Sequence, residues 1–463
     1  MDRRNFIRTT VGSLLGTRSL TSVFGQLALM EASSALSGPV FPDYRALVCV
    51  FMLGGNDGFN TIVPMSGGAR AAYESSRATL ALPVSQLLPL TPAADGGASD
   101  GCSYGVQSCL SAQDTVGAEG LRTLFDTGRA AVVCNVGALI QPTTKEDYQT
   151  KGFPLPPQLF SHNDQQTYWQ TCGGAGDIGW GGRMADLLHA ANENMAVPFS
   201  ISASGQATLL RSNTTSPYVV GSNHLDAMEF IDGSGHGSTR VAFEQLIAQG
   251  GQSHALASEY ANTARRTRET YALMSEALAA APPLATEFPS SPLGRQLRMV
   301  ARLISARQSL GLKRQIFYVE AGGFDTHDSQ LIDHPGLLSD LSQSMHALYL
   351  ATQELNVSNN VTTFTSSDFG RTLSSNGDGS DHGWGSHHIV LGGAVRGQRF
   401  FGDMPDLTAG GALDAGWGQI IPTSSIEQLA GTLGKWLGLT DSNVAQIFPN
   451  IVNFQLRDLG FMA

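Results

Sequence analysis

The chain has 463 residues, of which 42% are hydrophobic and only 14% charged, so the composition is that of a globular protein and excludes a disordered chain. The formal net charge is -11 and the sequence pI is near 5.4, and no basic stripe is available to neutralise phosphates, which excludes nucleic acid as a partner. An acidic chain with a local metal site is compatible with an anionic small-molecule or polymer ester as substrate, and the sequence leaves the oligomeric state open.

Residues 1–37 predict a twin-arginine export signal. Arg3 and Arg4 form the arginine pair, and a weakly hydrophobic run rich in glycine, serine and threonine follows over Thr9–Ala35. An arginine and several glycines interrupt this run, which makes it a poor membrane span. We therefore expect a protein that is exported already folded to the periplasm or beyond, with its mature domain in residues 38–463.

The five cysteines lack the Cys-x-x-Cys spacing of a thiolate zinc site. Cys102 and Cys109 flank a short polar loop and predict a disulfide. This pair lies in a segment of about residues 66–111 that is rich in Gly, Ala, Ser, Pro and Asp and is expected to be a surface insertion. Cys49 and Cys134 lie in apolar runs, where buried free thiols are expected.

Strands and helices alternate along the mature chain, which predicts one doubly wound, mostly parallel α/β sheet between layers of helices. The expected strands are residues 44–53, 130–136, 197–203, 315–319, 361–365 and 389–391. The expected helices are residues 120–127, a helix after residue 161, 179–189, 254–280, 291–311, 335–355 and 424–437. Residues 204–251 are expected to be irregular, and neither a repeat nor a linker divides the domain.

Carboxylates and an imidazole follow three of these strands directly. Asp57 comes after the first strand, Asp325 and His327 come after the strand at 315–319, and Asp368 comes after the strand at 361–365. The carboxyl ends of parallel strands meet at one edge of a sheet, so these side chains are expected to converge. Carboxylate and imidazole donors suit one or two divalent ions, zinc first, with manganese, magnesium or calcium as alternatives.

The stretch between the last two expected strands adds further candidate ligands. It carries Asp381, His382, His387 and His388. A loop that is merely soluble gains nothing particular from three imidazoles, which favours a site. Arg371 in the same stretch is expected to hold the anionic oxygens of an ester through its bidentate guanidinium.

Ser161 and His162 stand at the start of a predicted helix. Ser161 could be a helix N-cap, or it could be a nucleophile whose anion is favoured by the helix dipole and backbone N–H groups, and both interpretations remain open. His162 beside it is a candidate metal ligand or acid. A metal-bound water is the alternative nucleophile.

Several motifs, in this order, resemble the uncharacterised bacterial family catalogued as domain of unknown function 1501. They are the twin-arginine leader, LGGNDGFNT at 53–61, Ser161-His162, GGFDTH at 322–327, DFGRT at 368–372, DHG at 381–383, and the Phe-Pro-Asn and Leu-Gly-Phe-Met sequences near the end. The resemblance covers nearly the whole mature chain. It implies a fold similar to the alkaline phosphatase and sulfatase superfamily, an α/β/α sandwich with a two-metal site at the strand ends.

The resemblance also implies roles for single residues. Asp57 resembles the first metal aspartate of that superfamily, and Ser161 stands where its nucleophile stands. Asp325 and His327 resemble its first-zinc pair, although their spacing is Asp-x-His instead of Asp-x-x-x-His. Asp368 resembles the aspartate of its Asp-His pair, but Phe369 follows it. The missing histidine is therefore expected to be His382, with His387 or His388 as a third.

Together these features predict an exported metal-dependent hydrolase of phosphate or sulfate esters. The alternative is a non-catalytic secreted binding or scaffold protein that keeps the fold and one structural metal at most. Phe369 beside Asp368 favours that alternative, because a lost ligand can leave a single structural ion or none.

Overall fold

The computed structural model of the protein describes residues 39–110, 120–174, 177–225, 237–248 and 255–463, so the predicted export leader lies outside the described residues. Nine strands of this part form one sheet in the order β13-β5-β12-β9-β1-β8-β6-β7, with β14 also paired to β5. The strands are β1 (Arg45–Met52), β5 (Ala130–Gly137), β6 (Ser200–Ser202), β7 (Tyr218–Val219), β8 (Arg314–Ala321), β9 (Val361–Ser367), β12 (Ser386–Gly392), β13 (Phe400–Phe401) and β14 (Ser424–Ser425).

The sheet is mostly parallel, as the sequence predicts. β1 is parallel to β8 on one side and to β9 on the other, with Val48 opposite Phe317 and Thr363. β12 is antiparallel to both of its neighbours, β9 and β5. Every residue of β1 after Arg45 is buried, which is the environment its continuous apolar sequence requires.

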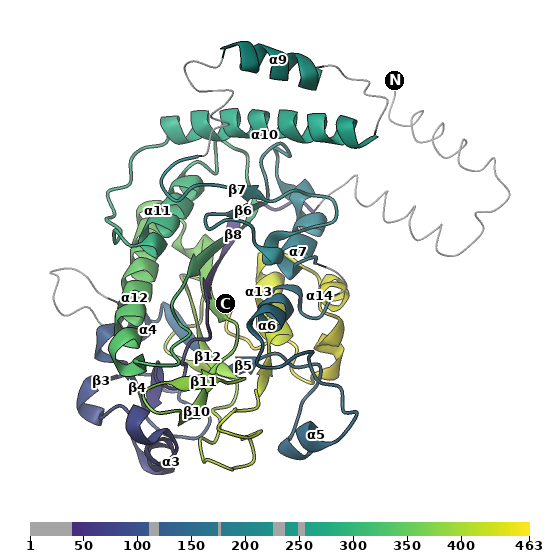
Figure 1. Ribbon diagram of the computed structural model, residues 1–463. Coiled ribbons are helices and arrows are strands. Elements are labelled where there is room, and N and C mark those ends of the chain that lie inside the picture. The colour runs from purple at the N-terminus through teal and green to yellow at the C-terminus, as the bar shows by residue number, and fades with distance from the viewer. Residues whose placement is uncertain (1–38, 111–119, 175–176, 226–236, 249–254) are drawn as a thin grey trace.

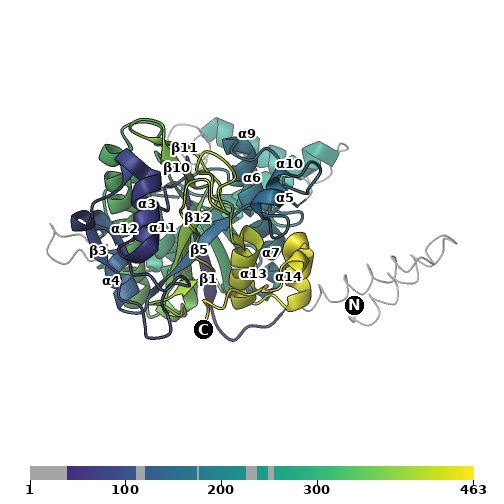
Figure 2. The same cartoon turned by 90° about the horizontal axis from the view of Figure 1, so that it is seen from below.

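Helices cover both faces of the sheet (Figure 1; Figure 2 gives the view from below). Val48 and Val50 of β1 belong to a core with α4 (Leu121–Asp126), α11 (Pro292–Ser305) and α12 (Gln330–Glu354). Leu47 and Cys49 belong to a second core with α6 (His162–Thr171), α7 (Trp180–Leu188), α13 (Ile426–Leu437) and α14 (Asp441–Ile447). Successive strand residues point to opposite faces, so one apolar run supplies both cores.

The segment after residue 65 is more deeply integrated than a surface insertion. It forms α3 (Gly67–Arg77) and, with β2 (Ile62–Pro64), a small sheet in which β4 (Tyr104–Gln107) lies between β2 and β3 (Leu87–Pro89). Tyr73 and Arg77 of α3 are fully buried. The segment therefore contributes to the interior around the strand ends.

The predicted disulfide is wrong. All five cysteines of the chain lie in the described residues and are free thiols, with Cys102 and Cys109 partly buried. β4 runs between these two residues and extends the chain by about 3.3 Å per residue, whereas a disulfide needs Cα atoms within about 7 Å. Cys49 and Cys134 are buried thiols as expected, and burial raises the pKa of each.

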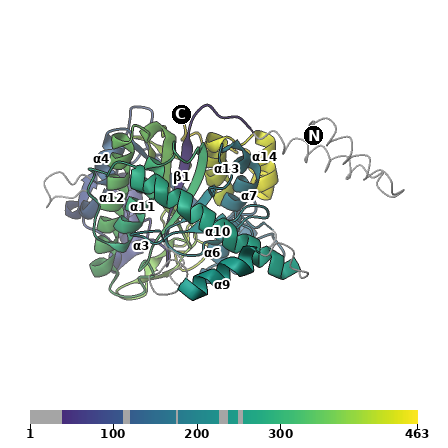
Figure 3. The same cartoon turned by 90° about the horizontal axis from the view of Figure 1, so that it is seen from above.

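The stretch expected to be irregular contains a helix, α9 (Gly237–Ala248), besides β7. α9 packs on α10 (Ala255–Ala280) through a small cluster of Ile247, Ala261 and Ala264. Figure 3 shows the two helices side by side across the upper end of the molecule. No helix among the described residues is both long and apolar enough to span a bilayer.

Two boundaries shift in ways that matter for the site. α12 begins at Gln330, five residues before the predicted start at Pro335, which brings Gln330 to the strand ends. β12 begins at Ser386, so His387 and His388 lie inside a strand instead of a loop. The remaining elements are α5 (Lys145–Gln149), β10 (Arg371–Ser375), β11 (Ser380–His382) and short 3-10 turns at Ala78–Leu80, Val84–Gln86, Ser108–Leu110, His189–Ala191, Thr208–Leu210, Ser358–Asn360 and Pro449–Asn453.

Candidate metal centre

Side chains from three segments meet at the carboxyl ends of β8 and β9. His162, Asp325 and His382 each offer one donor atom, and these atoms lie within 4.8 Å of one another. Asp325 follows β8, His162 is the first residue of α6, and His382 ends β11, which pairs with β10 so that His382 lies opposite Arg371. His162 Nε2 is 3.4 Å from Asp325 Oδ2, and His382 Nε2 is 3.5 Å from Asp325 Oδ1.

His327 stands at the edge of this group. Its Nε2 atom lies 2.9 Å from His382 Nε2 and 3.1 Å from Asp325 Oδ1. About 42% of its side chain is exposed, more than that of His162 or His382, so it lies on the solvent side.

An oxygen acceptor holds the other ring nitrogen of each of the three imidazoles. His162 Nδ1 contacts Asp368 Oδ2 at 2.6 Å, His382 Nδ1 contacts the Phe160 carbonyl at 2.7 Å, and His327 Nδ1 contacts Asp381 Oδ1 at 3.0 Å. Carboxylates and carbonyls accept hydrogen bonds, so each Nδ1 carries a proton, and each ring in its neutral form presents an Nε2 lone pair. This is how proteins orient histidines that ligate metal.

The three Nε2 lone pairs and the Asp325 carboxylate therefore face one another. Such an arrangement is repulsive unless a cation lies among the donors. His162 Nε2 is buried and has no hydrogen-bond partner among the described residues. Nitrogen and oxygen donors of this kind, without thiolates, fit a divalent ion of the zinc class.

Arg371 and Phe369 support this group from inside the protein. Arg371 is fully buried and donates from Nη1 to Asp325 Oδ1 at 2.7 Å and to the Gly54 carbonyl at 3.1 Å, and from Nη2 to the Ser380 carbonyl. Its guanidinium thus fixes Asp325 instead of facing solvent. Phe369 stacks on the His382 ring with centroids 4.6 Å apart.

Charge and burial lower the pKa values of two of the donors, Asp325 and His382. Burial works to raise the pKa of Asp325, but the hydrogen bond and charge of Arg371, with the two nearby imidazoles, outweigh it and lower that pKa. Burial is the main cause that lowers the pKa of His382. A carboxylate and a neutral imidazole are the forms that bind a metal.

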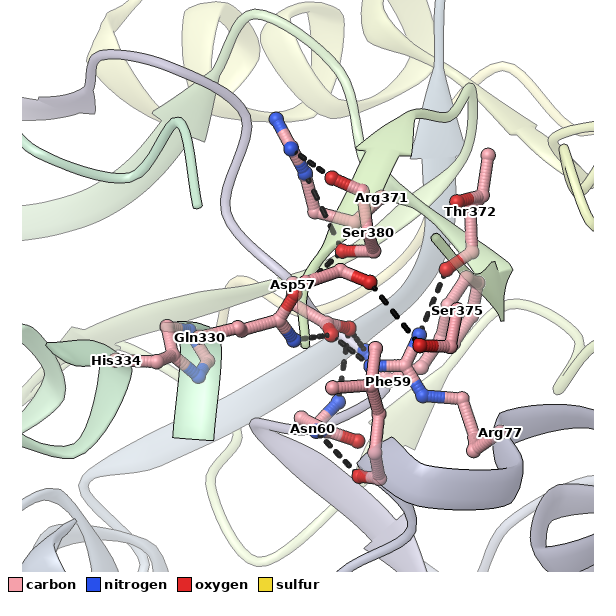
Figure 4. Close-up of polar contacts among 12 residues, drawn as sticks. Asp57, Phe59, Asn60, Arg77, Gln330, His334, Arg371, Thr372, Ser375 and Ser380 are labelled. Carbon is pink, nitrogen blue, oxygen red and sulfur yellow. Dashed lines mark hydrogen bonds and ion pairs between the residues drawn. The ribbon is translucent and has the colours of Figure 1, made fainter. Parts of the chain in front are cut away.

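Asp57 lies outside this group. Figure 4 shows its carboxylate in an ion pair with the buried guanidinium of Arg77, with a further hydrogen bond from the Gln330 amide. The backbone N–H groups of Phe59 and Asn60 also donate to it, at 3.1 Å and 3.0 Å. Gln330 in turn accepts a hydrogen bond from Ser380, so this network adjoins the donor group through Arg371.

His387 and His388 also lie apart from the donor group, inside β12. His387 Nδ1 accepts from the Asn135 N–H at 3.2 Å, and His388 lies edge-on to Trp169 with ring centroids 4.9 Å apart. Burial lowers the pKa of His387 to about 4 and that of His388 to about 3, so both rings are neutral. They are core residues of the sheet.

Ser161 precedes α6, and its hydroxyl donates to Asp164 Oδ2 at 2.6 Å.

Sequence reasoning missed four contributors: Phe160, Gln166, Arg77 and Gln330. Gln166 donates to Asp368 Oδ2 at 2.9 Å. It lies four residues after His162 on α6, so helical spacing could have identified it. Arg77 and Gln330 carry no such local signal.

Comparisons with known proteins add a family. The chain matches no curated protein. It is similar to a solved structure described as the crystal structure of Ps i-CgsB in complex with k-i-k-neocarrahexaose, with 8% identity, a TM-score of 0.33, and coverage of 90% of this chain and 77% of that chain. A TM-score of 0.33 is too low to indicate a shared fold or function. The family model described as protein of unknown function (DUF1501) matches residues 44–439, and the chain belongs to that family.

Proposed function

We propose that the protein is a metal-dependent hydrolase of phosphate or sulfate esters that binds one divalent ion through His162, Asp325 and His382. The observation that carries the proposal is the arrangement of the three imidazoles. Each donates from Nδ1 to an oxygen acceptor, and each turns its Nε2 lone pair toward Asp325.

Three protein ligands leave a coordination position for water or substrate, which is the pattern of catalytic zinc sites. The ligand side chains are 24–44% exposed, so an ester can reach them from solvent. A bound ion of this class would polarise an ester oxygen and lower the pKa of a coordinated water.

His327 is the side chain that can move a proton in this mechanism. It lies beside the ligand group and is held by Asp381, an arrangement that keeps an imidazole in one tautomer and stabilises it when it is protonated. We assign it the transfer of a proton from the attacking water or to the leaving oxygen. Ser161 is the less favoured nucleophile because its hydroxyl is already bound to Asp164.

The surroundings of Asp57 favour one ion over two. In the alkaline phosphatase and sulfatase superfamily, which the sequence motifs resemble, a two-metal site is expected. Here Arg77 neutralises Asp57 and three N–H donors contact its oxygens. A carboxylate so fully satisfied has little to gain from a second metal ion.

One observation favours the non-catalytic alternative. His327 Nε2 is close enough to His382 and Asp325 to act as a fourth protein ligand. Four protein ligands would close a tetrahedral zinc site, as in structural sites. The two functions therefore differ in whether the ion keeps an open position.

The test is a panel of aryl phosphates, sulfates and phosphodiesters on protein reconstituted with zinc, manganese or magnesium. We expect turnover with at least one ester class, lost in Asp325→Ala and His382→Ala. His224→Ala, which removes an exposed histidine of the irregular stretch, is the matched control and should keep full activity. Metal-loaded protein that hydrolyses no ester would overturn the proposal in favour of a binding or scaffold role.

A further inference from the structure

Trp417 differs from every other tryptophan of the chain. All five tryptophans lie in the described residues, and four of them are buried, with 2–6% of their surface exposed. Trp417 is 85% exposed. A large aromatic ring held in water forgoes the burial that stabilises the others, and its face is accessible to a ligand.

The backbone presents this ring at the tip of a tight, well-bonded turn. Trp417 has φ 59°, a left-handed conformation that is unfavourable for a bulky residue and that is often retained at functional sites. The buried Asp414 carboxylate accepts hydrogen bonds from the N–H groups of Gly416 and Gly418, each at 2.9 Å, on either side of Trp417. Two further backbone hydrogen bonds close the turn: the Ala415 N–H donates to the Gln419 carbonyl at 2.9 Å, and the Gln419 N–H donates to the Gly416 carbonyl at 3.0 Å.

Hydrogen bonds connect the same turn to the two strands that carry Arg371 and His382. The Gly418 carbonyl accepts from the Leu373 N–H at 2.9 Å, and Leu373 lies two residues from Arg371 on β10. The Gln419 side chain donates to the His382 carbonyl at 3.1 Å. Residues 402–423, yellow-green at the bottom of Figure 1, run beside β10 and β11. Two residues of a strand span about 6.6 Å, so the turn that carries Trp417 adjoins the part of β10 that holds Arg371.

We propose that Trp417 is a stacking platform that binds a ring of the ester substrate, an inference that rests on the proposed hydrolase function. An indole face packs on rings that present an apolar face, either the C–H face of a sugar or the planar face of an aryl group, and its rigid side chain loses little entropy on binding. The substrate class is then a phosphate or sulfate ester carried by such a ring, in preference to an acyclic ester.

The experiment uses the fluorescence of the exposed indole. Acrylamide quenching of the zinc-loaded protein is measured with phenyl phosphate, phenyl sulfate, glucose 6-phosphate and glucose 6-sulfate, and with glycerol phosphate and glycerol sulfate as acyclic controls. Ring esters should protect Trp417 from quenching, and acyclic esters should not. The phenyl and glucose arms distinguish an aryl from a sugar ring.

Two variants complete the test. Trp417→Gly removes the ring, and glycine suits the left-handed backbone, so the variant should fold normally. It should bind ring esters about tenfold more weakly and bind acyclic esters with unchanged affinity. Trp417→Phe should keep most of the affinity for ring esters.

The stacking proposal is overturned if no ring ester protects Trp417 from quenching, or if glycerol esters protect it equally. It is also overturned if protection depends on protein concentration and not on ester concentration. If zinc binding and ester turnover persist in that case, the proposed function stands without it. If the protein neither binds zinc nor hydrolyses esters, the proposed function fails independently of Trp417. Protection of Trp417 by ring esters in that protein would still support a ring-binding site there.

Discussion

His327 and His382 bring their Nε2 atoms within 2.9 Å of each other, although the Nδ1 atom of each ring already donates to an oxygen acceptor. Two neutral imidazoles in these tautomers present lone pairs to each other, and Asp325 adds a carboxylate 3.1 Å from the first and 3.5 Å from the second. A divalent cation relieves this repulsion, so the first prediction concerns metal content.

The purified protein is expected to bind one zinc ion per chain. His382→Ala should lose it, and Asp368→Asn should bind it about 10- to 100-fold more weakly, because Asp368 orients His162 without joining the ligands. Isothermal titration and elemental analysis measure both. Unchanged affinity in Asp368→Asn would show that His162 is not a ligand, and His224→Ala again serves as control.

His327→Gln is expected to keep the bound ion and to lose about 10²- to 10⁴-fold in kcat, the usual contribution of a general acid or base. Metal content and steady-state kinetics on the same preparation separate the two effects. If the variant loses its ion together with its activity, His327 is a fourth ligand, and the closed site of a structural protein becomes the better description.

Asp57→Asn and Arg77→Met are each expected to destabilise the fold by about 3–5 kcal/mol, because each breaks a fully buried ion pair and leaves the remaining partner as a buried charge without its counter-ion. Urea denaturation measures the loss. Metal content should stay at one ion in both variants. A drop from two ions to one in Asp57→Asn would instead make Asp57 a ligand.

Cys102→Ser and Cys109→Ser are expected to leave stability within about 0.5 kcal/mol, because neither removes a disulfide and a serine hydroxyl can replace the Cys109 thiol as hydrogen-bond donor to Gln107 Oε1. Mass spectrometry of an alkylated, non-reduced digest should find both thiols modified. A linked peptide pair would mean that β4 rearranges in solution.

Glu427 in the first turn of α13 predicts a pH dependence of stability. Burial raises its pKa from 4.5 to about 7, against the hydrogen bond from Asn450 and the charge of Arg183. The folded chain therefore binds more protons than the unfolded chain between these values, and stability falls as pH rises from 4.5 through about 7.

The difference between the two pKa values corresponds to about 3 kcal/mol at most. Glu427→Gln should remove that share of the pH dependence, and urea denaturation at pH 5 and pH 8.5 compares the variant with wild type. If the free energy of unfolding changes by the same amount between these two pH values in the variant and in wild type, the prediction is wrong.

The sequence by itself determined the layered architecture and the sheet edge at which the candidate ligands are expected to meet. Continuous apolar runs such as Ala46–Met52 can only be satisfied inside a parallel sheet, and they end at turns whose polar residues meet at one edge. That is why Asp325, His327, Asp368 and His382 could be named as candidates before any coordinates.

Only the tertiary structure decided which of these side chains meet. His162 reaches Asp368 across 206 residues, and Asp57 is paired with an arginine on α3, in a segment whose composition looked peripheral. His387 and His388 differ from His382 only in lying within β12, where neighbouring strands bury them. Local patterns encode where a strand ends, whereas the partner of a buried charge depends on long-range packing, which no short stretch of sequence contains.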